Sequence, residues 1–532
     1  MKMSLSISLV ILAISGVAVA IYAEQAPSNV PAPGPYNDST MIQPRYGGVL
    51  TAILDSGISG LGAPQDKVQN IDYVRTAPPA MECLFFQDNQ SNLRPKLAHA
   101  WDIASDGRTI TFHLQKGVKF HDGTDFNAQA VKWNLENFRF GGPGGAIPSF
   151  LKTVTSYKVI DDYAIQLNLS VFNADLFNNM DLYPAMASPK AASSVTSPET
   201  VAKDHTVGTG PFIFDSWKRD QFIKYVKNPH YWQKGKPYLD GVQILQIADP
   251  VTRLMAFKSG QGQMIFRLTP SDAHDLETAG YKIILGNRPP TFYLIPDGAN
   301  PESPFHNIKV REAVEYAIDK KAIVSGIGYG YYKVVDDFAP PGQTFSGLQP
   351  RNYDPRKAKQ LLSEAGFPTG FKTKLMAPTT ADRTALTAVQ TYLKAVGIDA
   401  TVDLADISRI VTITQQGWTN GILFPMSPTN GDLVSVSRFY GDKRYISAYV
   451  SAFRPSGWFE KLASAISDPN ETSRAAKAHE LLRMMSEQAM GIPLWTLPSI
   501  AAQDKTVHNL GWSQGMDLYA QWAEAWLSTS TM

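Results

Sequence analysis

The sequence predicts an α/β protein built from two or three lobes. The chain has 532 residues, of which 44% are hydrophobic and 11% aromatic, enough for more than one large core. Residues 108–138 change from an alternating, strand-like pattern to a helical one. Residues 386–404 run the other way, from a helical pattern through a glycine into an alternating strand. Such alternation of helices and strands is typical of α/β folds.

Composition excludes several functions. The chain has 49 basic and 48 acidic residues, so no basic excess draws it to nucleic acid. Its single cysteine, Cys83, rules out an intramolecular disulfide and any paired-cysteine metal or redox site. We therefore expect no nucleic-acid partner, no cofactor and no metal.

The N-terminus is typical of an export signal. Lys2 precedes an uncharged run over 3–23, which contains two small-residue cleavage candidates, 18–20 and 21–23. The run is also long enough to span a membrane, so residues 1–23 are predicted to be a signal peptide or an N-terminal anchor. Residues 24–44 are rich in proline and form a predicted linker, either disordered or acting as a spacer.

Residues 93–138 predict a strand, a tight turn and a capped helix. The strand over 108–114 follows the turn signal Asp106-Gly107, and Asn127 is a suitable helix N-cap. The strand's apolar face is Ile110, Phe112 and Leu114, and the helix's apolar face is Val131, Leu135 and Phe138. These residues are explained by folding, and none of them requires a catalytic role.

The second half of the chain predicts three helices and a strand. Residues 305–320 form an amphipathic pattern that Asn307 can cap. Asp354-Pro355 begins the next helix, with Asp as N-cap and Pro at the first helical position, and Gly366 ends it. A third helix runs to Gly397, and a strand over 398–404 follows.

The chain resembles the peptide- and nickel-type solute-binding proteins of ABC importers, bacterial extracellular family 5, over about residues 45–502. The matching positions of the signature region are Arg94-Pro95, Leu97-Ala98, Trp101, Asp106-Gly107, Thr111-Phe112, Leu114, Lys116–Thr124 and Val131–Trp133. Further matches are the opening segment 46–52 and the segments 208–212, 227–232 and 237–240. So many positions in order make this resemblance specific.

The resemblance implies a two-lobed periplasmic-binding-protein fold of type II, the large class with an extra subdomain. A hinge joins the lobes, and ligand is enclosed between them. The implied lobe boundaries are as follows: 45–90 and 206–295 for two parts of lobe I, 91–205 for its extra subdomain, 296–500 for lobe II, and 501–532 for a C-terminal return to lobe I.

The resemblance also implies a function in transport. We expect the substrate-binding component of an ABC importer, which captures a small molecule or peptide and delivers it to a membrane permease and its ATPase. Such a protein is expected to be a monomer, exported to the periplasm or the outer face of the cell membrane, and released or tethered by its N-terminal helix. A membrane-tethered sensor or surface scaffold of the same fold is the alternative.

Ligand contacts are expected in the second lobe. Peptide-binding relatives place a carboxylate after a Gly-Trp-like segment, and the corresponding stretch here is 416–440. It carries Pro425–Pro428 where the acid is expected, and Asp432 is the nearby acid, which disfavours a ligand with an ammonium group. The candidate contacts are Trp418, Phe424, Asp432, Arg438, Tyr332 and Trp495. Core, turn and surface roles are the alternatives for each.

Catalysis is not expected. The sequence has no Gly-x-Ser-x-Gly elbow, no HExxH motif and no phosphate-binding Walker motif. His113 and His121 lie eight residues apart on a predicted strand and turn, which is not a short metal-chelating spacing. A hydrolase on this scaffold is therefore disfavoured.

Overall fold

The computed structural model describes residues 43–55, 61, 76–87, 93–138, 147–180, 184–193, 206–286, 289–339, 350–427, 437–441, 449–510 and 522–528. Residues 43–532 form one compact unit. The predicted signal peptide or anchor (1–23), most of the linker (24–44) and the candidate contact Asp432 lie outside the described residues. None of the described helices combines the length and apolar character needed to cross a membrane.

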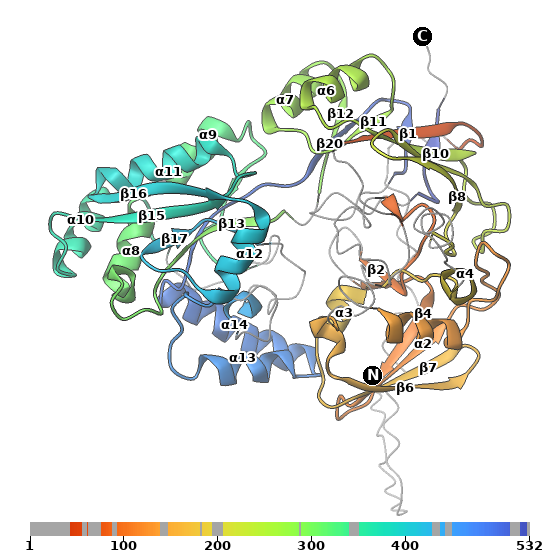
Figure 1. Ribbon diagram of the computed structural model, residues 1–532, viewed down its shortest axis with the longest axis horizontal. Helices are drawn as coiled ribbons and strands as arrows, with labels where there is room; N and C mark the ends of the chain where they lie inside the picture. Colours follow the sequence, from red (N-terminus) through yellow and green to blue (C-terminus); the bar gives the residue numbers. More distant parts are fainter. Residues whose placement is uncertain are drawn as a thin grey trace, which may run out of the picture. The chain divides into compact units, whose positions relative to one another are not determined.

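The first lobe is built on a mixed sheet with strand order β12-β20-β11-β1-β10-β9-β8 (Figure 1). Strands β1 and β10 pair in parallel, with Val49 opposite Gly241. Its elements are β1 (Val49–Leu54), β8 (Phe212–Lys218), β9 (Phe222–Lys227), β10 (Gly241–Gln246), α6 (Pro250–Lys258), β11 (Met264–Ile265), α7 (Pro270–Thr278), β12 (Lys282–Leu285) and β20 (Ile500–Gln503). Because successive strand residues face opposite sides, Ala52 joins one core and Ile53 joins the other, beneath α6 and α7.

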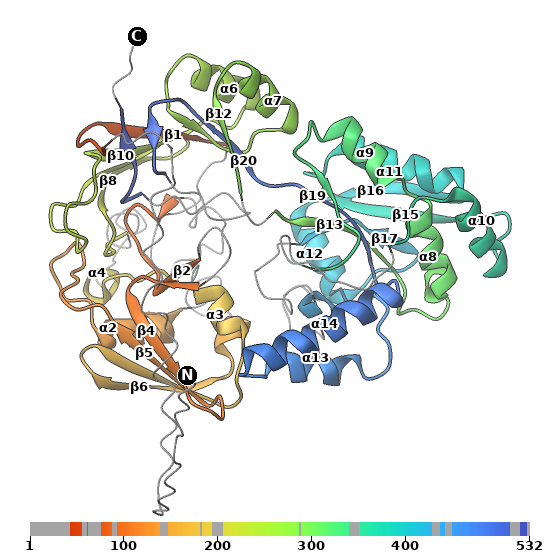
Figure 2. The ribbon, with the colours of Figure 1, turned by 180° about the vertical axis from the view of Figure 1, so that it is seen from behind.

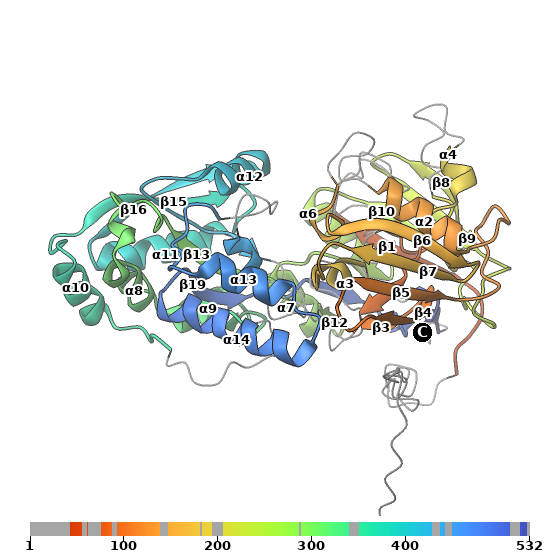
Figure 3. The same cartoon turned by 90° about the horizontal axis from the view of Figure 1, so that it is seen from below.

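A second sheet, in the order β4-β5-β7-β6, contains the signature region. Asn127 caps the helix that follows it, its side chain accepting from the Ala130 amide, and the predicted apolar faces of strand and helix are buried. Figure 3 shows α2 beside β6. The elements of this subdomain are β4 (Ala98–Ile103), β5 (Thr109–Leu114), α2 (Ala128–Asn137), β6 (Val154–Asp161) and β7 (Ala164–Leu169).

Short elements accompany these two sheets. They are β2 (Phe85–Gln87), β3 (Leu93–Pro95), η1 (Ser149–Leu151), α3 (Asp175–Met180), α4 (Pro189–Ser193), β21 (Val507–His508) and β22 (Trp526–Leu527).

The second lobe is built on a sheet with strand order β14-β19-β13-β17-β15-β16, and β18 also pairs with β13. Its strands are β13 (Thr291–Pro296), β14 (Lys333–Val334), β15 (Phe371–Pro378), β16 (Ile398–Ala405), β17 (Gly421–Leu423), β18 (Met426–Ser427) and β19 (Ile492–Thr496). Its helices are η2 (Pro304–His306), α8 (Ile308–Tyr316), α9 (Lys320–Ile327), α10 (Pro355–Glu364), α11 (Arg383–Ala395), α12 (Ile407–Gln416), η3 (Ser437–Tyr440), α13 (Trp458–Ile466) and α14 (Glu471–Glu487).

Each face of the second-lobe sheet has its own core. Leu375 and Ala377 pack with α8, α10 and α11, whereas Met376, between them, packs with α13 and α14. The predicted caps at Asn307 and Asp354 are confirmed, since each side chain accepts from a backbone amide of its helix.

Two sequence predictions need correction. Residues 305–320 were expected to form one helix, but α8 ends at Tyr316 and α9 starts at Lys320, because Asp319 caps a new helix with its side chain. The second lobe was expected to start at residue 296, but β13 already pairs in its sheet from Thr291. The remaining lobe boundaries stay predictions.

Candidate functional site

Two short crossovers connect the lobes. The chain passes from β12 to β13 through 286–290 and returns from β19 to β20 through 497–499 (Figure 2). The crossovers bond to each other: the Gly286 amide donates to the Ser499 carbonyl at 2.8 Å, and the Leu497 amide donates to the Pro290 carbonyl at 3.3 Å. The ends of β13 and β19 at the crossovers therefore mark where the second lobe meets the first.

An aromatic cluster lies at this crossover end of the second-lobe sheet. Trp495 stacks on Tyr332, with ring centroids 6.3 Å apart at 14°, and contacts Phe424 at 6.2 Å. Phe292, opposite Trp495 in the β13–β19 ladder, contacts Phe424 at 5.6 Å. We call Phe292, Tyr332, Phe424 and Trp495 the crossover cluster. Three of its four members are residues that the sequence singled out as ligand contacts.

The backbone explains how the crossover cluster forms. Tyr332 directly precedes β14, whose Val334 pairs with Trp495. Between Phe292 and Tyr293 the register against β19 shifts, which leaves Leu494 as an extra residue and reorients Trp495 beside it. Three separate segments thus deliver rings to one place, together with Phe424 from beyond β17.

The crossover cluster is apolar, and most of it is buried. Trp495 and Phe424 are 1% exposed and Tyr332 is 5% exposed, while Phe292 is half-buried. Met426, paired with Phe292, is 46% exposed. Burial and the neighbouring Asp382 carboxylate raise the pKa of the Tyr332 hydroxyl above its ordinary value, so this hydroxyl is protonated at neutral pH. A ligand at this end of the sheet would therefore contact Phe292 and Met426 first. The buried rings of Phe424 and Trp495 lie behind Phe292.

Sequence reasoning missed Phe292 and Met426. Phe292 begins the apolar run 292–296, which predicts a buried strand but gives no sign of which end faces the other lobe. The place of Phe292 in the crossover cluster depends on its pairing register with β19, about two hundred residues away in sequence. No local sequence pattern contains this register.

Trp418 lies apart from the crossover cluster. It is 6% exposed, its indole N–H donates to the Gly421 carbonyl at 3.2 Å, and it packs in the α13–α14 core. Arg438 lies in η3. The proposed ligand contacts of Trp418, Asp432 and Arg438 all stay predictions. The structure thus brings Tyr332, Phe424 and Trp495 together, whereas Trp418 packs in the separate core beneath α13 and α14.

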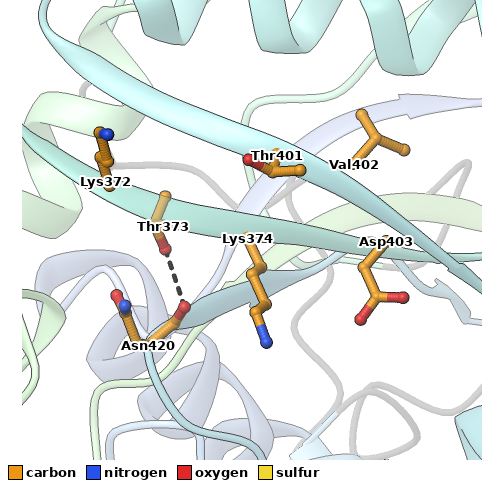
Figure 4. A pocket seen from close by; sticks show the side chains of 7 residues that line it. All are labelled: Lys372, Thr373, Lys374, Thr401, Val402, Asp403 and Asn420. Carbon is orange, nitrogen blue, oxygen red and sulfur yellow. Dashed lines mark hydrogen bonds between the residues drawn. The ribbon is translucent and has the colours of Figure 1, made fainter.

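A polar recess opens at the other end of the second-lobe sheet. It has a volume of ≈ 470 Å³ and lies between β15, β16 and the turn before β17 (Figure 4). We call this pocket the distal recess. Its lining residues are Lys372, Thr373, Lys374, Thr401, Val402, Asp403 and Asn420. Thr373 donates to the Asn420 carbonyl at 3.1 Å, and Asp403 forms an ion pair with Arg409.

The buried carboxylate of Glu82, in the first lobe, is held by several hydrogen-bond donors. Glu82 is 1% exposed and accepts hydrogen bonds from Thr209, Tyr231 and Trp232 at 2.8–2.9 Å. Lys96 lies 3.5 Å from it. A carboxylate with this many donors is a structural group. Within the described ranges, no group of three or more His, Cys, Asp or Glu side chains is arranged to hold a metal ion.

Comparisons with known proteins agree with this architecture. The glutathione-binding protein GsiB of Shigella boydii is 36% identical over 338 residues, which cover 61% of this chain and 64% of that protein. GsiB of Salmonella typhi is 34% identical over the same shares. The match thus spans somewhat less than two thirds of the length of these curated relatives.

Solved structures share the fold. The periplasmic binding protein DppA of Helicobacter pylori, in complex with a peptide, has a TM-score of 0.74 at 22% identity and covers 91% of this chain and 98% of its own. NikA of Brucella suis, in complex with Fe(III)-EDTA, has a TM-score of 0.78 at 21% identity and covers 90% and 100%. The two-lobed, type II binding-protein fold is confirmed. The middle region that defines the bacterial extracellular solute-binding proteins, family 5, matches residues 92–442, and the chain therefore belongs to that family.

Proposed function

We propose that this protein is the substrate-binding component of an ABC importer, which takes up a small solute and delivers it to a membrane permease and its ATPase. The observation that carries this proposal is the family match over residues 92–442, which runs from the signature subdomain through most of the second lobe. Two lobes joined by two adjacent crossovers support it, because this arrangement permits hinge closure around a ligand.

We propose a short peptide or peptide-like solute as the ligand, with glutathione as the first candidate. Relatives 34–36% identical to the chain are glutathione-binding proteins. The Pro425–Pro428 segment still argues against recognition of an ammonium group by an acid at that point, so recognition would rely more on apolar contact. Asp432 and Arg438 remain candidates for pairing with the charged groups of such a ligand.

The crossover cluster is our candidate for the second-lobe wall of the binding site. Phe292 and Met426 expose apolar atoms at the end of the sheet nearest the crossovers. Trp495, Tyr332 and Phe424 support them from within the core, which fixes the rings in place. Preorganised aromatic surface of this kind gives affinity at a low cost in conformational entropy.

We further propose that the protein binds without chemical conversion, acts as a monomer and works outside the cytoplasm. Export is supported by the N-terminal pattern of residues 1–23 and by the periplasmic relatives. Cell fractionation and N-terminal sequencing would distinguish a released protein from one held by an uncleaved anchor.

The experiment that tests the proposed function is a thermal-shift screen of the purified protein against glutathione, short peptides, metal chelates and small organic acids. A ligand at 100 times its dissociation constant stabilises the folded state by about 2.7 kcal/mol. We expect glutathione or a short peptide to raise the melting temperature by a few degrees. A shift with chelates alone would overturn the ligand class, and no shift across the panel would favour the sensor or scaffold alternative.

A further inference from the structure

The segment between α9 and β14 makes a tight turn at the crossover end of the second lobe. Helix α9 ends at Ile327 with Gly328 as its C-cap, and Tyr329 and Gly330 both adopt left-handed backbone conformations, with φ of 47° and 86°. The Tyr331 amide closes the turn on the Gly328 carbonyl at 2.8 Å. Because β14 begins two residues later and pairs with β19, the backbone of this turn belongs to the second lobe.

Two consecutive tyrosines from this turn enter different lobes. Tyr332 packs in the second-lobe core against Trp495. Tyr331, 7% exposed, packs in the first-lobe core beneath α6 and α7, with Ile53 and Leu276 among its neighbours. Leu497, in the returning crossover, packs against both cores. The turn therefore adds a side-chain connection between the lobes beyond the two covalent crossovers.

The hydroxyl groups of the two tyrosines follow the same division. The Tyr331 hydroxyl donates to Glu277 Oε2 of α7, in the first lobe, at 2.9 Å. Burial and Glu277 raise the pKa of Tyr331 to about 12, so the hydroxyl is a donor throughout the neutral range. The Tyr332 hydroxyl instead lies within electrostatic reach of the Asp382 carboxylate, the N-cap of α11 in its own lobe, which helps to raise its pKa. One turn earlier on α7, His274 lies against the Tyr329 ring at 5.5 Å.

We propose that Tyr331 and Glu277 are positioning residues that tether the two lobes and set how often the protein opens. Opening that separates α7 from the Tyr329–Tyr332 turn must break the Tyr331–Glu277 hydrogen bond and withdraw the ring from the first-lobe core. The tether stabilises the arrangement seen here against any opening that separates α7 from the Tyr329–Tyr332 turn. Its consequence for affinity rests on the proposed function, whereas its effect on opening does not.

Opening can be measured without any ligand, by the distance between labels on the two lobes. Cysteines introduced at the exposed positions Lys258 on α6 and Lys359 on α10 would carry the labels, since the native Cys83 is buried. Single-molecule energy transfer on the full-length protein then gives the ratio of open to closed molecules. We expect Tyr331→Phe to raise this ratio about two- to tenfold, the range expected for one hydrogen bond.

The adjacent tyrosine provides the matched control. Tyr332→Phe also removes one hydroxyl from a buried ring, but the neighbouring carboxylate, Asp382, lies in the same lobe, so the distance distribution should not change. Glu277→Ala should reproduce the effect of Tyr331→Phe, and the double variant should add little to either, because both changes remove the same bond.

An unchanged distribution in both Tyr331→Phe and Glu277→Ala would overturn the tether, as would an equal shift in Tyr332→Phe. Titration with glutathione separates the tether from the proposed function. If no variant binds glutathione, the ligand assignment fails, while the label distances still decide whether the tether exists.

Discussion

The crossover cluster and the distal recess occupy opposite ends of one sheet, and they differ in almost every physical respect. The crossover cluster is apolar, ring-rich and mostly buried, and it adjoins the segments that lead to the other lobe. The distal recess is open, is lined by two lysines and an acid, and lies beside the start of β15, the middle of β16 and the turn before β17. We propose that the ligand is held at the crossover cluster and not at the distal recess. The predictions below test this distinction.

The largest effect is expected for Trp495→Ala, at the crossover end. Removing a fully buried indole that stacks on Tyr332 leaves a cavity, so the free energy of unfolding should fall by about 3–5 kcal/mol. Urea denaturation would measure the loss. Trp495→Phe, which keeps a ring, should lose much less, and a loss below about 1 kcal/mol for the alanine variant would show that the cluster is not packed as described.

Trp418→Phe tests the other tryptophan that the sequence singled out. The variant loses the N–H donor to the Gly421 carbonyl and part of the buried volume, so unfolding should become easier by about 1–3 kcal/mol. Because Trp418 is buried in the α13–α14 core, we expect the dissociation constant for ligand to stay within about twofold. A severalfold weakening would instead confirm Trp418 as a ligand contact and extend the site beyond the crossover end.

A pH-dependent effect is expected at Asp297, beside the distal recess. Its Oδ2 accepts from the Asn420 amide, and burial raises the pKa of this carboxyl despite that hydrogen bond. The folded protein therefore keeps a proton that the unfolded chain releases above about pH 3.9, so this group lowers stability as the pH rises through that window. As the pH rises from about 3.9 to the raised pKa of the folded state, the stability gained by Asp297→Asn over the wild type should grow, and above that pKa it should level off. A gain that instead increases as the pH falls would contradict this assignment.

The smallest effect is expected for the double variant Lys372→Ala/Lys374→Ala. Both side chains are exposed, and within the described part of the chain neither forms an ion pair. Unfolding free energy should change by no more than about 0.5 kcal/mol, and ligand affinity should not change. A loss of affinity measured by calorimetry would move the site, or part of it, to the distal recess.

Local signals predicted the framework of this fold well. The caps at Asn127 and Asp354, the strand predicted over 108–114 and the helix–glycine–strand unit ending at β16 depend on residues close in sequence, and the structure confirms them, with the strand starting at Thr109. The break between α8 and α9 was missed because Asp319 can also be accommodated on a continuous helix face; only its capping of the Ala322 amide reveals the new start.

The candidate site depends on long-range pairing and was therefore less predictable. An aromatic residue in a buried run can serve the core or a ligand, and sequence alone does not distinguish Trp418 from Trp495. The difference comes from β13–β19 pairing, which places Trp495 at the crossovers, and from the indole bond that keeps Trp418 in its core. The division of Tyr331 and Tyr332 between two lobes likewise depends on two left-handed residues in the preceding turn.

The measurement that tests the central claim most directly is calorimetric titration of glutathione into the wild type, Phe292→Ala and Trp418→Phe in parallel. The proposed site predicts saturable binding of one ligand to the wild type, weaker binding to Phe292→Ala and unchanged binding to Trp418→Phe. Weaker binding to Trp418→Phe with none lost in Phe292→Ala would contradict the crossover site, and no binding of glutathione or short peptides to the wild type would contradict the proposed ligand class.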